Sequence, residues 1–437
     1  MKINRRKFLI GASALAAATV TPYAFWQMNK IKTNAHIVVV GGGTAGLSFV
    51  NKLNLYADQP NVTLIEPRNF HWYQPGQTLL LAGVYTSATE VIEDIGLHIP
   101  DNVTYLMDQV AQYEPDHNRI VTASNNHISY DYLIVATGVE LRYDLIEGLD
   151  KVEIGRNNIA SIYAYPQAGL DTKRQLDDFL KKGEGQAIFT RPKGSMKCAG
   201  APMKVANLAE YFAQQTKQRN HFLFDYFTSE NFLFSVPDFN EAIGTIWQQR
   251  NVTPHYEHAI VGIDSIANTA YFRLPDDSIE LRTYDFIHLV PPMSTNLALR
   301  ESDLANRDSF SGYLDVDQFS LQHKRYPNVF GIGDVVGTPI GKTAASVKTQ
   351  VPVVVDNLCA LLTNQAVYQQ WSGYTSCPMI LDVGHAMLWE FDFSLKPTTT
   401  LPIKVVDPVK PSTLSWFMEE RLIRPVYDLM LKGYTPI

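Results

Sequence analysis

The chain has 437 residues, of which 46% are hydrophobic and 19% charged, so it can bury the cores of about two to three domains. Its formal net charge of −7 argues against nucleic acid as a partner. Three cysteines are too few for a fold held together by disulfides, so we expect a pair among them to be catalytic rather than structural.

Residues 1–30 are predicted to be an export signal and a spacer. Arg5 and Arg6 precede an alanine-rich, weakly apolar stretch at residues 11–20, which resembles a twin-arginine signal. That stretch is shorter than the roughly 20 residues that span a bilayer. We therefore expect a protein on the periplasmic face of the cytoplasmic membrane, attached peripherally. An uncleaved anchor and an unrelated basic tail are the alternatives.

The strongest motif follows a run of β-branched residues at positions 36–40. Gly41, Gly43 and Gly46 have the spacing G-x-G-x-x-G between a predicted strand and a predicted helix. In dinucleotide-binding units these glycines allow a tight turn, close approach of a pyrophosphate, and packing of helix on strand. Twenty residues after Gly46, Glu66 ends a second strand and is placed to bind a ribose. The motif favours a dinucleotide over an empty glycine turn, but it does not separate FAD from NAD.

Two later strands end in polar residues. Residues 130–138 form a buried strand closed by Ala136, Thr137 and Gly138, and residues 328–334 end at Asp334. This order resembles flavoproteins with two dinucleotide-binding domains. The resemblance implies that Thr137 and Gly138 close the FAD unit and that Asp334 binds the ribityl chain. It also places a helix start at Lys342, Thr343 and Ala344 beside the flavin pyrimidine, where the helix dipole stabilises negative charge.

Smaller elements are predicted between these strands. Residues 103–106 and 119–121 have the pattern of short strands in a meander. His71 lies in an aromatic loop and is expected to be a packed, hydrogen-bonded residue rather than a base.

A second nucleotide fingerprint is missing. The strand at residues 186–190 leads into Arg191, Pro192 and Lys193. A pyrophosphate would have to approach the backbone closely here, and these residues do not allow it as glycines would. The electron donor is therefore not expected to be NAD(P)H. Instead, this loop carries Cys198.

The three cysteines differ in their surroundings. Cys359 lies in an apolar, helical segment and is expected to be a small buried hydrophobe. Cys198 and Cys377 lie in segments interrupted by Gly and Pro, where functional residues concentrate. Their separation in the sequence does not by itself pair them.

Five segments resemble sulfide:quinone oxidoreductases, in particular the subgroup that includes the animal mitochondrial enzymes. They lie at residues 71–76, 197–204, 341–345, 373–378 and 389–393. The resemblance spans residues 36–435. It implies FAD as cofactor and a redox-active disulfide between Cys198 and Cys377.

The resemblance also implies a reaction. Hydrosulfide attacks Cys377 and leaves a persulfide there, while Cys198 is freed as a thiolate that reacts with the flavin. Two electrons then pass to a membrane quinone, and the sulfane sulfur passes to an acceptor nucleophile. Lys197 and Lys204 are placed to stabilise a thiolate, but as lysines flanking a loop they are expected to be solvated and are left out of the site.

The predicted fold is α/β, with two Rossmann-like domains and a C-terminal, membrane-associating extension. We expect the FAD domain at residues 35–148 and 280–350, the second domain at 149–279, and the extension at 351–437. In the extension, residues 412–431 have an amphipathic pattern interrupted by Pro425, which is typical of a segment lying in a membrane interface. A docked terminal helix is the alternative. No metal site is predicted, and the question of a homo-oligomer is left open.

Three other functions remain as alternatives. The first is the flavoprotein subunit of a flavocytochrome c sulfide dehydrogenase, which passes electrons to a haem partner. The second is an NADH:quinone oxidoreductase, which the missing second fingerprint disfavours. The third is a non-enzymatic, redox-sensing, flavin-binding module.

Overall fold

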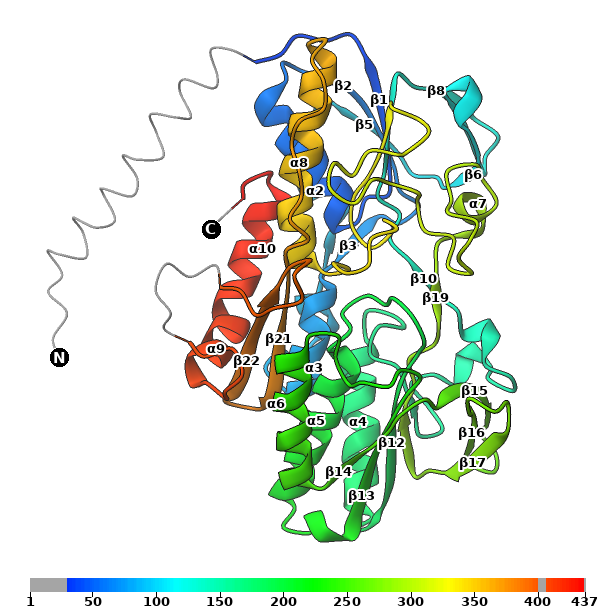
Figure 1. The fold of residues 1–437 in the computed structure, drawn as a ribbon, viewed down its shortest axis with the longest axis vertical. Coiled ribbons are helices and arrows are strands. Elements are labelled where there is room, and N and C mark those ends of the chain that lie inside the picture. The colour runs from blue at the N-terminus through cyan, green and yellow to red at the C-terminus, as the bar shows by residue number, and fades with distance from the viewer. Residues whose placement is uncertain (1–29, 400–405, 436–437) are drawn as a thin grey trace, which may run out of the picture.

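Two parallel sheets divide the chain into two α/β units that lie end to end along the long axis of the molecule (Figure 1). The computed structural model describes residues 30–399 and 406–435. The predicted export signal therefore lies outside the described residues, apart from Lys30. The two parallel sheets confirm the predicted α/β class.

The first unit is built around a five-stranded parallel sheet. In spatial order its strands are β20 (Val329–Gly331), β9 (Tyr132–Val135), β1 (His36–Val40), β2 (Asn61–Ile65) and β5 (Val103–Leu106). Strand β1 is buried on both faces, as its run of Ile and Val predicts. Ile37 and Val39 face a core shared with helices α2 (Thr44–Tyr56) and α8 (Ala344–Leu362). The alternate residues Val38 and Val40 pack against an antiparallel sheet.

That antiparallel sheet corrects one prediction. It consists of β6 (Val110–Glu114), β7 (Arg119–Thr122) and β8 (His127–Ser129), so the strand near 119 does belong to a meander. The strand at Val103–Leu106 does not, because it pairs in parallel with β2 and forms the edge of the main sheet. Its short, alternating sequence is compatible with either partner, and tertiary pairing decides between them.

The second unit repeats the α/β plan. Its parallel sheet has the order β11 (Ile159–Ala160), β18 (Phe286–His288), β12 (Gly185–Arg191), β13 (Phe222–Thr228) and β14 (Val252–His255). The helices of this unit are α4 (Ala168–Lys181), α5 (Ala201–Gln215) and α6 (Pro237–Arg250), and an antiparallel sheet is formed by β15 (Ala259–Asp264), β16 (Thr269–Arg273) and β17 (Ile279–Thr283).

The chain crosses between the two units twice. The crossing segments pair antiparallel as β10 (Glu140–Leu141) and β19 (Met293–Ser294). Shorter elements complete the chain: β3 (Phe70–Trp72), β4 (Ile92–Asp94), α3 (Gln77–Ala82) and α7 (Leu297–Arg300). The domain limits near 148, 279 and 350 stay a prediction.

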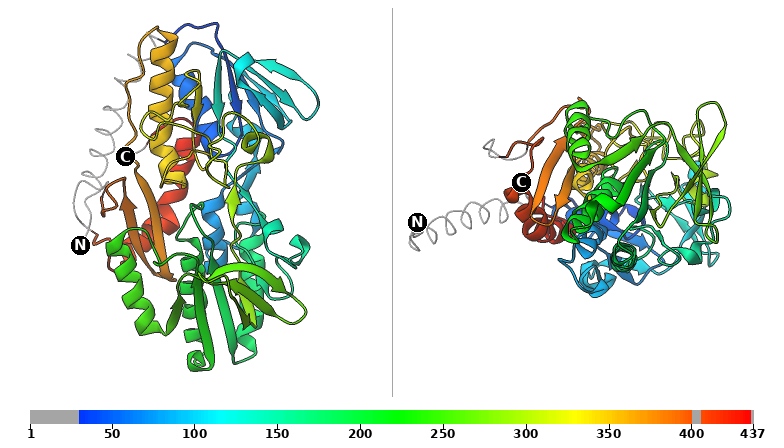
Figure 2. Two further views of the ribbon diagram at one scale, coloured as in Figure 1. Left: turned by 45° about the vertical axis from the view of Figure 1, so that its right-hand side comes forward. Right: turned by 90° about the horizontal axis from the view of Figure 1, so that it is seen from below.

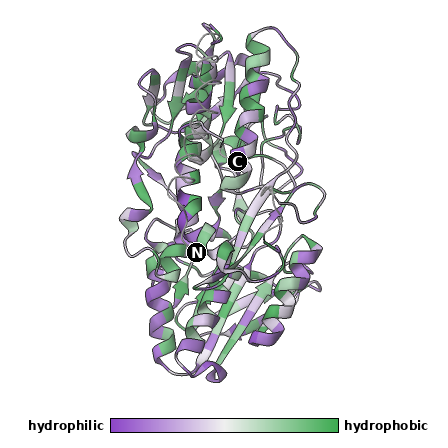
Figure 3. Cartoon of the chain, turned by 90° about the vertical axis from the view of Figure 1, so that its left-hand side faces the viewer, coloured by the Kyte–Doolittle hydropathy of each residue, from purple (hydrophilic) through white to green (hydrophobic). Residues whose placement is uncertain are grey.

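The C-terminal elements lie along one side of both units (Figure 2). A hairpin of β21 (Thr375–Asp382) and β22 (His385–Phe391) packs on α5 of the second unit, while α10 (Ile423–Leu431) packs on α2 of the first. Between them lie α9 (Thr413–Phe417) and a π-helical turn, Met418–Leu422. Hydrophobic and hydrophilic stretches alternate along the helices of this side (Figure 3).

The predicted interruption of the C-terminal helix is present, but it lies before Pro425. The π-helical turn contains Arg421, whose carbonyl group the ring of Pro425 would crowd in a regular α-helix. Pro425 itself is accommodated in the first turn of α10. Within the described residues, no helix is long and apolar enough to span a bilayer.

Candidate active site

The three glycines after β1 meet three different steric demands. Gly41 has φ +107°, and a Cβ there would lie 2.4 Å from the carbonyl oxygen of Ala136. A Cβ on Gly46 would lie 1.8 Å from the carbonyl oxygen of Gly41, because α2 packs directly on the turn. A Cβ on Gly43 would meet nothing within 4 Å. This is the division of roles that a dinucleotide cradle requires, with open space at the middle glycine.

Glu66 stands at the carboxyl end of β2 and is 3% exposed. Its Oε2 accepts a hydrogen bond from the backbone N–H of Gly42 at 2.8 Å, and its Oε1 accepts one from Nε of Arg68 at 2.7 Å. The carboxylate is thus fixed beside the glycine turn, where a ribose would lie next to a bound pyrophosphate.

Two neighbouring strand ends supply the remaining predicted cofactor residues. At the end of β9, the hydroxyl of Thr137 is buried and has no hydrogen-bond partner among the described residues. Gly138 has φ +67°, and a Cβ there would meet nothing within 4 Å. Asp334 follows the adjacent strand β20, and burial raises its pKa against the opposing charges of Lys342 and Lys197. An orphaned hydroxyl and open glycines between two strand ends fit a bound dinucleotide.

The helix α8 starts where it was predicted, and Lys342 just before it is bound by the protein itself. Its ammonium group donates to the carbonyl oxygens of Asp334 and Val336, both at 2.7 Å, and lies 3.6 Å above the ring of Tyr313. Burial lowers the pKa of Lys342 to about 7. Lys342 therefore braces the loop after β20. Thr343 caps the helix by accepting from the N–H of Ser346 at 3.1 Å, and Ala344 is the first helical residue.

Cys198 and Cys377 come together from distant parts of the chain. Cys198 lies in the loop between β12 and α5, with φ +48°, and its N–H donates to the carbonyl oxygen of Lys342 at 2.9 Å. Positive φ is uncommon outside glycine and marks a conformation imposed by the surroundings. Cys377 lies on β21 and is 4% exposed. The two thiols are hydrogen-bonded to each other, and both are free.

Cys377 lies over the N-terminus of α5. The backbone of Gly200 hydrogen-bonds its sulfur, and a Cβ on Gly200 would come within 2.5 Å of Sγ. The glycine is therefore needed for the sulfur to reach the helix end, whose free N–H groups favour negative charge. This contact explains why glycine and small residues surround the cysteine motif.

Electrostatics distinguish the two thiols. The hydrogen bond from Cys377, the charge of Lys204 and a hydrogen bond from Tyr163 outweigh burial and lower the pKa of Cys198 to about 6. The hydrogen bond to Cys198 and burial raise the pKa of Cys377. Cys198 is therefore the thiolate of the pair near neutral pH, and Cys377 keeps its proton.

The prediction that Lys197 and Lys204 are solvated is wrong. Lys197 is 9% exposed, donates to Oε1 of Gln74 at 2.9 Å, and has its pKa lowered to about 8 by burial. Lys204 is 4% exposed and lies 3.8 Å from the buried carboxylate of Glu419 in the π-helical turn. Glu419 and the cysteine sulfurs raise the pKa of Lys204 against the effect of burial, so its ammonium stays charged.

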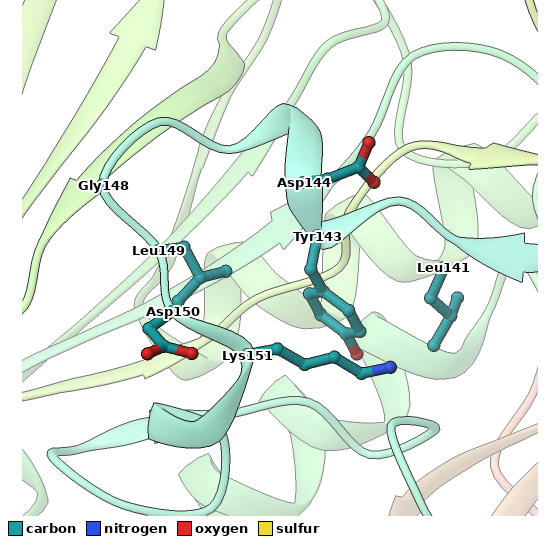
Figure 4. A pocket seen from close by; sticks show the side chains of 7 residues that line it. All are labelled: Leu141, Tyr143, Asp144, Gly148, Leu149, Asp150 and Lys151. Atoms are coloured by element: carbon teal, nitrogen blue, oxygen red, sulfur yellow. The ribbon is translucent and has the colours of Figure 1, made fainter.

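The thiols open into a cavity of about 200 Å³ between the two units. Its walls include both cysteines, Ala199 just before α5, and Thr343 at the start of α8. A larger surface hollow of about 580 Å³, lined by Tyr143, Asp144 and residues 148–151, lies after the first crossing between the units (Figure 4). That hollow contains no cysteine and none of the predicted site residues.

Two predictions about residues outside the site are confirmed. Cys359 is buried in the core between α2 and α8, and burial raises its pKa to about 12. His71 is 2% exposed and hydrogen-bonds through Nε2 to the hydroxyl of Tyr427 at 2.7 Å. Burial lowers the pKa of His71 to about 3, so it is neutral and packed.

Three buried residues near the thiols were not identified from the sequence: Tyr163, Arg191 and Glu419. Tyr163 follows β11 in a loop with no distinguishing motif, and Glu419 lies about 220 residues from its partner Lys204. Only Arg191 carried a signal, because it ends a strand where a nucleotide fingerprint would require small residues.

Comparison with known proteins decides the family. A family model described as pyridine nucleotide-disulphide oxidoreductase matches residues 35–174. The mitochondrial sulfide:quinone oxidoreductase of Mus musculus is 33% identical over 92% of this chain and 88% of its own length. This chain belongs to the sulfide:quinone oxidoreductase family. The mitochondrial enzyme of Schizosaccharomyces pombe is 34% identical with the same coverage of both chains.

Solved structures agree on the fold. The crystal structure of the sulfide:quinone oxidoreductase of Aquifex aeolicus superposes with a TM-score of 0.77 at 20% identity, covering 92% of both chains. A chain in the Tetrahymena thermophila mitochondrial ATP synthase tetramer superposes with a TM-score of 0.78 at 16% identity, covering 92% of this chain and 97% of that one. These likenesses confirm the α/β fold with two units and are consistent with two dinucleotide-binding domains.

Family membership confirms FAD as the cofactor, in agreement with the geometry of the glycine turn, Glu66 and Thr137. The relatives also bear on the cellular location. Those from mouse and S. pombe are named as mitochondrial. The predicted twin-arginine signal lies outside the described part of the chain. The signal, and the periplasmic location inferred from it, therefore stay predictions.

Proposed function

We propose that this protein oxidises sulfide through Cys198, Cys377 and FAD and passes two electrons to a quinone. The observation that carries the proposal is the cysteine pair. Two residues 179 positions apart share a hydrogen bond, line one cavity and have thiol pKa values shifted in opposite directions, which suits Cys198 to leave and Cys377 to be attacked in a disulfide exchange. The names of the relatives support the same activity.

The first chemical step is thiol–disulfide exchange. In the oxidised enzyme, hydrosulfide attacks the sulfur of Cys377, the bond between the two cysteines breaks, and Cys198 leaves as a thiolate. Cys198 is the better leaving group because its pKa is the lower of the two. Cys377 then carries a persulfide over the N-terminus of α5, whose N–H groups stabilise the anionic outer sulfur.

An acceptor nucleophile removes the outer sulfur and releases Cys377. The bond between the two sulfurs of the persulfide breaks, and both electrons of that bond stay with Cys377. Re-forming the disulfide with Cys198 then releases two electrons. Bound FAD supplies the two-electron carrier between this dithiol and the quinone. For an acceptor thiolate RS⁻ and quinone Q, the reaction HS⁻ + RS⁻ + Q + 2H⁺ gives RSSH + QH₂.

We further propose that the C-terminal segment attaches the enzyme to a membrane surface. Leu414, Phe417, Leu422 and Leu429 are 41–50% exposed on α9, the π-helical turn and α10, while Glu419 on the same segment points inward. Exposed apolar side chains on one amphipathic segment favour a membrane interface, where the quinone is dissolved. Export of the folded holoenzyme by the N-terminal signal would place this surface on the periplasmic face.

The test is to mix the oxidised enzyme in the absence of oxygen with excess sulfide, which also serves as the acceptor nucleophile, and to record the flavin spectrum. We expect rapid bleaching that a short-chain quinone reverses. Cys198→Ser and Cys377→Ser should each slow bleaching at least about 100-fold, because neither variant can form the disulfide that sulfide attacks. Cys359→Ala is the matched control and should bleach at the normal rate, since Cys359 lies in the core.

The alternatives predict other outcomes. Bleaching that a cytochrome c reverses and quinone does not would indicate a flavocytochrome c subunit. Bleaching by NADH and not by sulfide would indicate an NADH:quinone oxidoreductase. Bound flavin that neither donor reduces would indicate a redox-sensing module. Each of these results would contradict the proposed function.

A further inference from the structure

One buried cation in the cysteine cavity has no part in the reaction described above. Arg191 is the last residue of β12 and is 6% exposed. It lines the cavity together with Cys198 and Cys377. The ring of Phe232 lies 5.1 Å from its guanidinium carbon.

The guanidinium group has unmet hydrogen-bonding capacity. Within residues 30–399 and 406–435, Nε and Nη1 of Arg191 are buried and have no hydrogen-bond partner. A buried charge without a partner is expensive, so proteins keep one where a ligand completes it. The other charged groups of the cavity are already engaged: Lys342 by two carbonyl oxygens, and Glu230 by the N–H of Gly194 at 2.8 Å.

The position of Arg191 in the fold is a ligand position. It lies at the carboxyl end of β12, beside Thr228 at the carboxyl end of the parallel strand β13. Ligands of open α/β sheets bind in the crevice outside the carboxyl ends of the strands. Arg191 thus lies where a dinucleotide-binding unit would have its glycine-rich turn and bind a phosphate. In the second unit an arginine stands there instead of the glycines.

The size and walls of the cavity limit what that ligand can be. Its volume of about 200 Å³ is several times the roughly 30 Å³ that one water occupies in the liquid, so it exceeds the needs of hydrosulfide. Apolar side chains, among them Phe232, Phe234 and Phe391, form much of the wall. The cavity therefore suits a molecule with a short carbon chain and one anionic group.

Resting on the proposed function, we propose that Arg191 binds the acceptor of the sulfane sulfur, and that this acceptor is a small thiol carrying an anionic group. The guanidinium pairs with the anionic group, and the apolar wall holds the carbon chain. The acceptor thiolate then attacks the outer sulfur of the Cys377 persulfide. A new S–S bond forms in the product, the old one breaks, and Cys377 leaves as a thiolate, so the transfer itself needs no further oxidant.

The experiment compares two acceptors that differ in charge. Sulfide oxidation is measured with 3-mercaptopropionate, which is anionic, and with 2-mercaptoethanol, which is neutral, using wild-type enzyme, Arg191→Met, Arg191→Lys and Lys193→Met. Loss of a charge-assisted hydrogen bond should raise the KM of Arg191→Met for 3-mercaptopropionate about tenfold or more. Its KM for 2-mercaptoethanol should stay within about twofold, because that thiol has no group for the guanidinium to bind.

The two remaining variants separate charge from shape. Arg191→Lys keeps the charge and should lie between wild type and Arg191→Met. Lys193→Met removes an exposed charge from the same loop and should leave both KM values unchanged. The rate at which excess sulfide alone bleaches the flavin should be unchanged in all four proteins, because hydrosulfide then also takes the outer sulfur and has no second anionic group for Arg191 to bind.

The outcomes separate the two proposals. Equal changes for both thiols, or none for either, would overturn the role of Arg191 and leave the proposed function intact. Slower bleaching by sulfide in Arg191→Met would also overturn it, since Arg191 would then serve the first substrate. Failure of sulfide to bleach the wild-type flavin would overturn both proposals together.

Discussion

At the scale of single residues, the site is a set of opposed electrostatic influences on two thiols. Burial disfavours both thiolates, yet Cys198 gains stabilisation from Cys377, Lys204 and Tyr163. Glu419 holds the charge of Lys204 in place from the other side. The same burial keeps the hydroxyl of Tyr163 protonated, so it acts as a hydrogen-bond donor to Cys198.

This arrangement predicts how the reactivity of Cys198 depends on pH. In the reduced enzyme, alkylation of Cys198 should rise with a midpoint near pH 6, the value to which its pKa is lowered. Tyr163→Phe removes one donor to the thiolate and should move the midpoint up by about one pH unit, equivalent to about 1.4 kcal/mol. Mass spectrometry of iodoacetamide-treated protein, following the peptide that contains Cys198, gives the profile.

Tyr165→Phe is the matched control for that measurement. Its hydroxyl lies in the same loop but hydrogen-bonds Asp171 at 2.9 Å, away from the cysteines. We expect its midpoint to equal that of the wild type. A midpoint that stays near pH 6 in Tyr163→Phe would show that the tyrosine does not stabilise the thiolate.

At the scale of elements, each half of the site depends on a helix start packed against a strand end. The glycine turn places α2 against β1, and Gly200 places the start of α5 against the sulfur of Cys377. In both places glycine has no side chain, so its backbone can approach closely. Gly46 approaches the carbonyl group of Gly41, and Gly200 approaches the reactive sulfur of Cys377.

The middle and the last glycine of the turn should therefore respond differently to alanine. Gly46→Ala places a methyl group 1.8 Å from the carbonyl oxygen of Gly41, and we expect it to destabilise even the apoprotein, by about 1–3 kcal/mol or more. Gly43→Ala meets no protein atom within 4 Å, so the apoprotein should be as stable as wild type while FAD binding weakens.

Urea unfolding of the apoproteins and FAD titration of each separate these effects. Weakened FAD binding in both variants with unchanged apoprotein stability would contradict the steric assignment of Gly46. Full FAD affinity in Gly43→Ala would mean that the pyrophosphate does not approach that residue.

The C-terminal segment makes a prediction of its own. Replacing Phe417 and Leu422 by serine removes two half-exposed apolar side chains, each worth about 1 kcal/mol of interfacial burial. Binding to liposomes, measured by co-sedimentation, should fall by about tenfold or more, while bleaching by sulfide stays normal. As a control, Leu223→Ser changes an exposed leucine on β13 of the second unit and should leave liposome binding unchanged.

At the scale of the whole molecule, the C-terminal elements bind the two units to each other. The hairpin β21–β22 belongs to the core of the second unit, while Tyr427, Met430 and Leu431 of α10 belong to the core of the first. Cys377 lies on this hairpin, so the position of one reactive sulfur depends on how the C-terminal elements are packed.

The sequence predicted the parts of this molecule that rest on local patterns. The strand before Gly41, the helix start at Thr343 and the buried state of Cys359 follow from spacing and hydrophobic runs of a few residues. The pairing of Cys198 with Cys377 came only through resemblance to a family. Contacts such as that of Lys204 with Glu419 join distant segments, and no local pattern marks them, so burial of these charges was not predicted.

That contact gives the prediction that concerns the whole molecule. Lys204 and Glu419 are both about 95% buried, and their pairing joins α5 to the C-terminal segment. Glu419→Leu leaves a buried, unpaired ammonium group and should lower the free energy of unfolding by about 3–5 kcal/mol, whereas the double variant Lys204→Met/Glu419→Leu should recover most of that loss. Glu420→Gln breaks only the pair with the exposed Arg421 at 2.9 Å and should cost less than about 1 kcal/mol.

Urea unfolding of the holoenzyme, combined with limited proteolysis, tests this directly. Suppose that Glu419→Leu is as stable as the wild type and that protease cleaves its C-terminal segment no faster. The ion pair then does not hold the C-terminal segment, and the apolar contacts of α10 with α2 must do so alone.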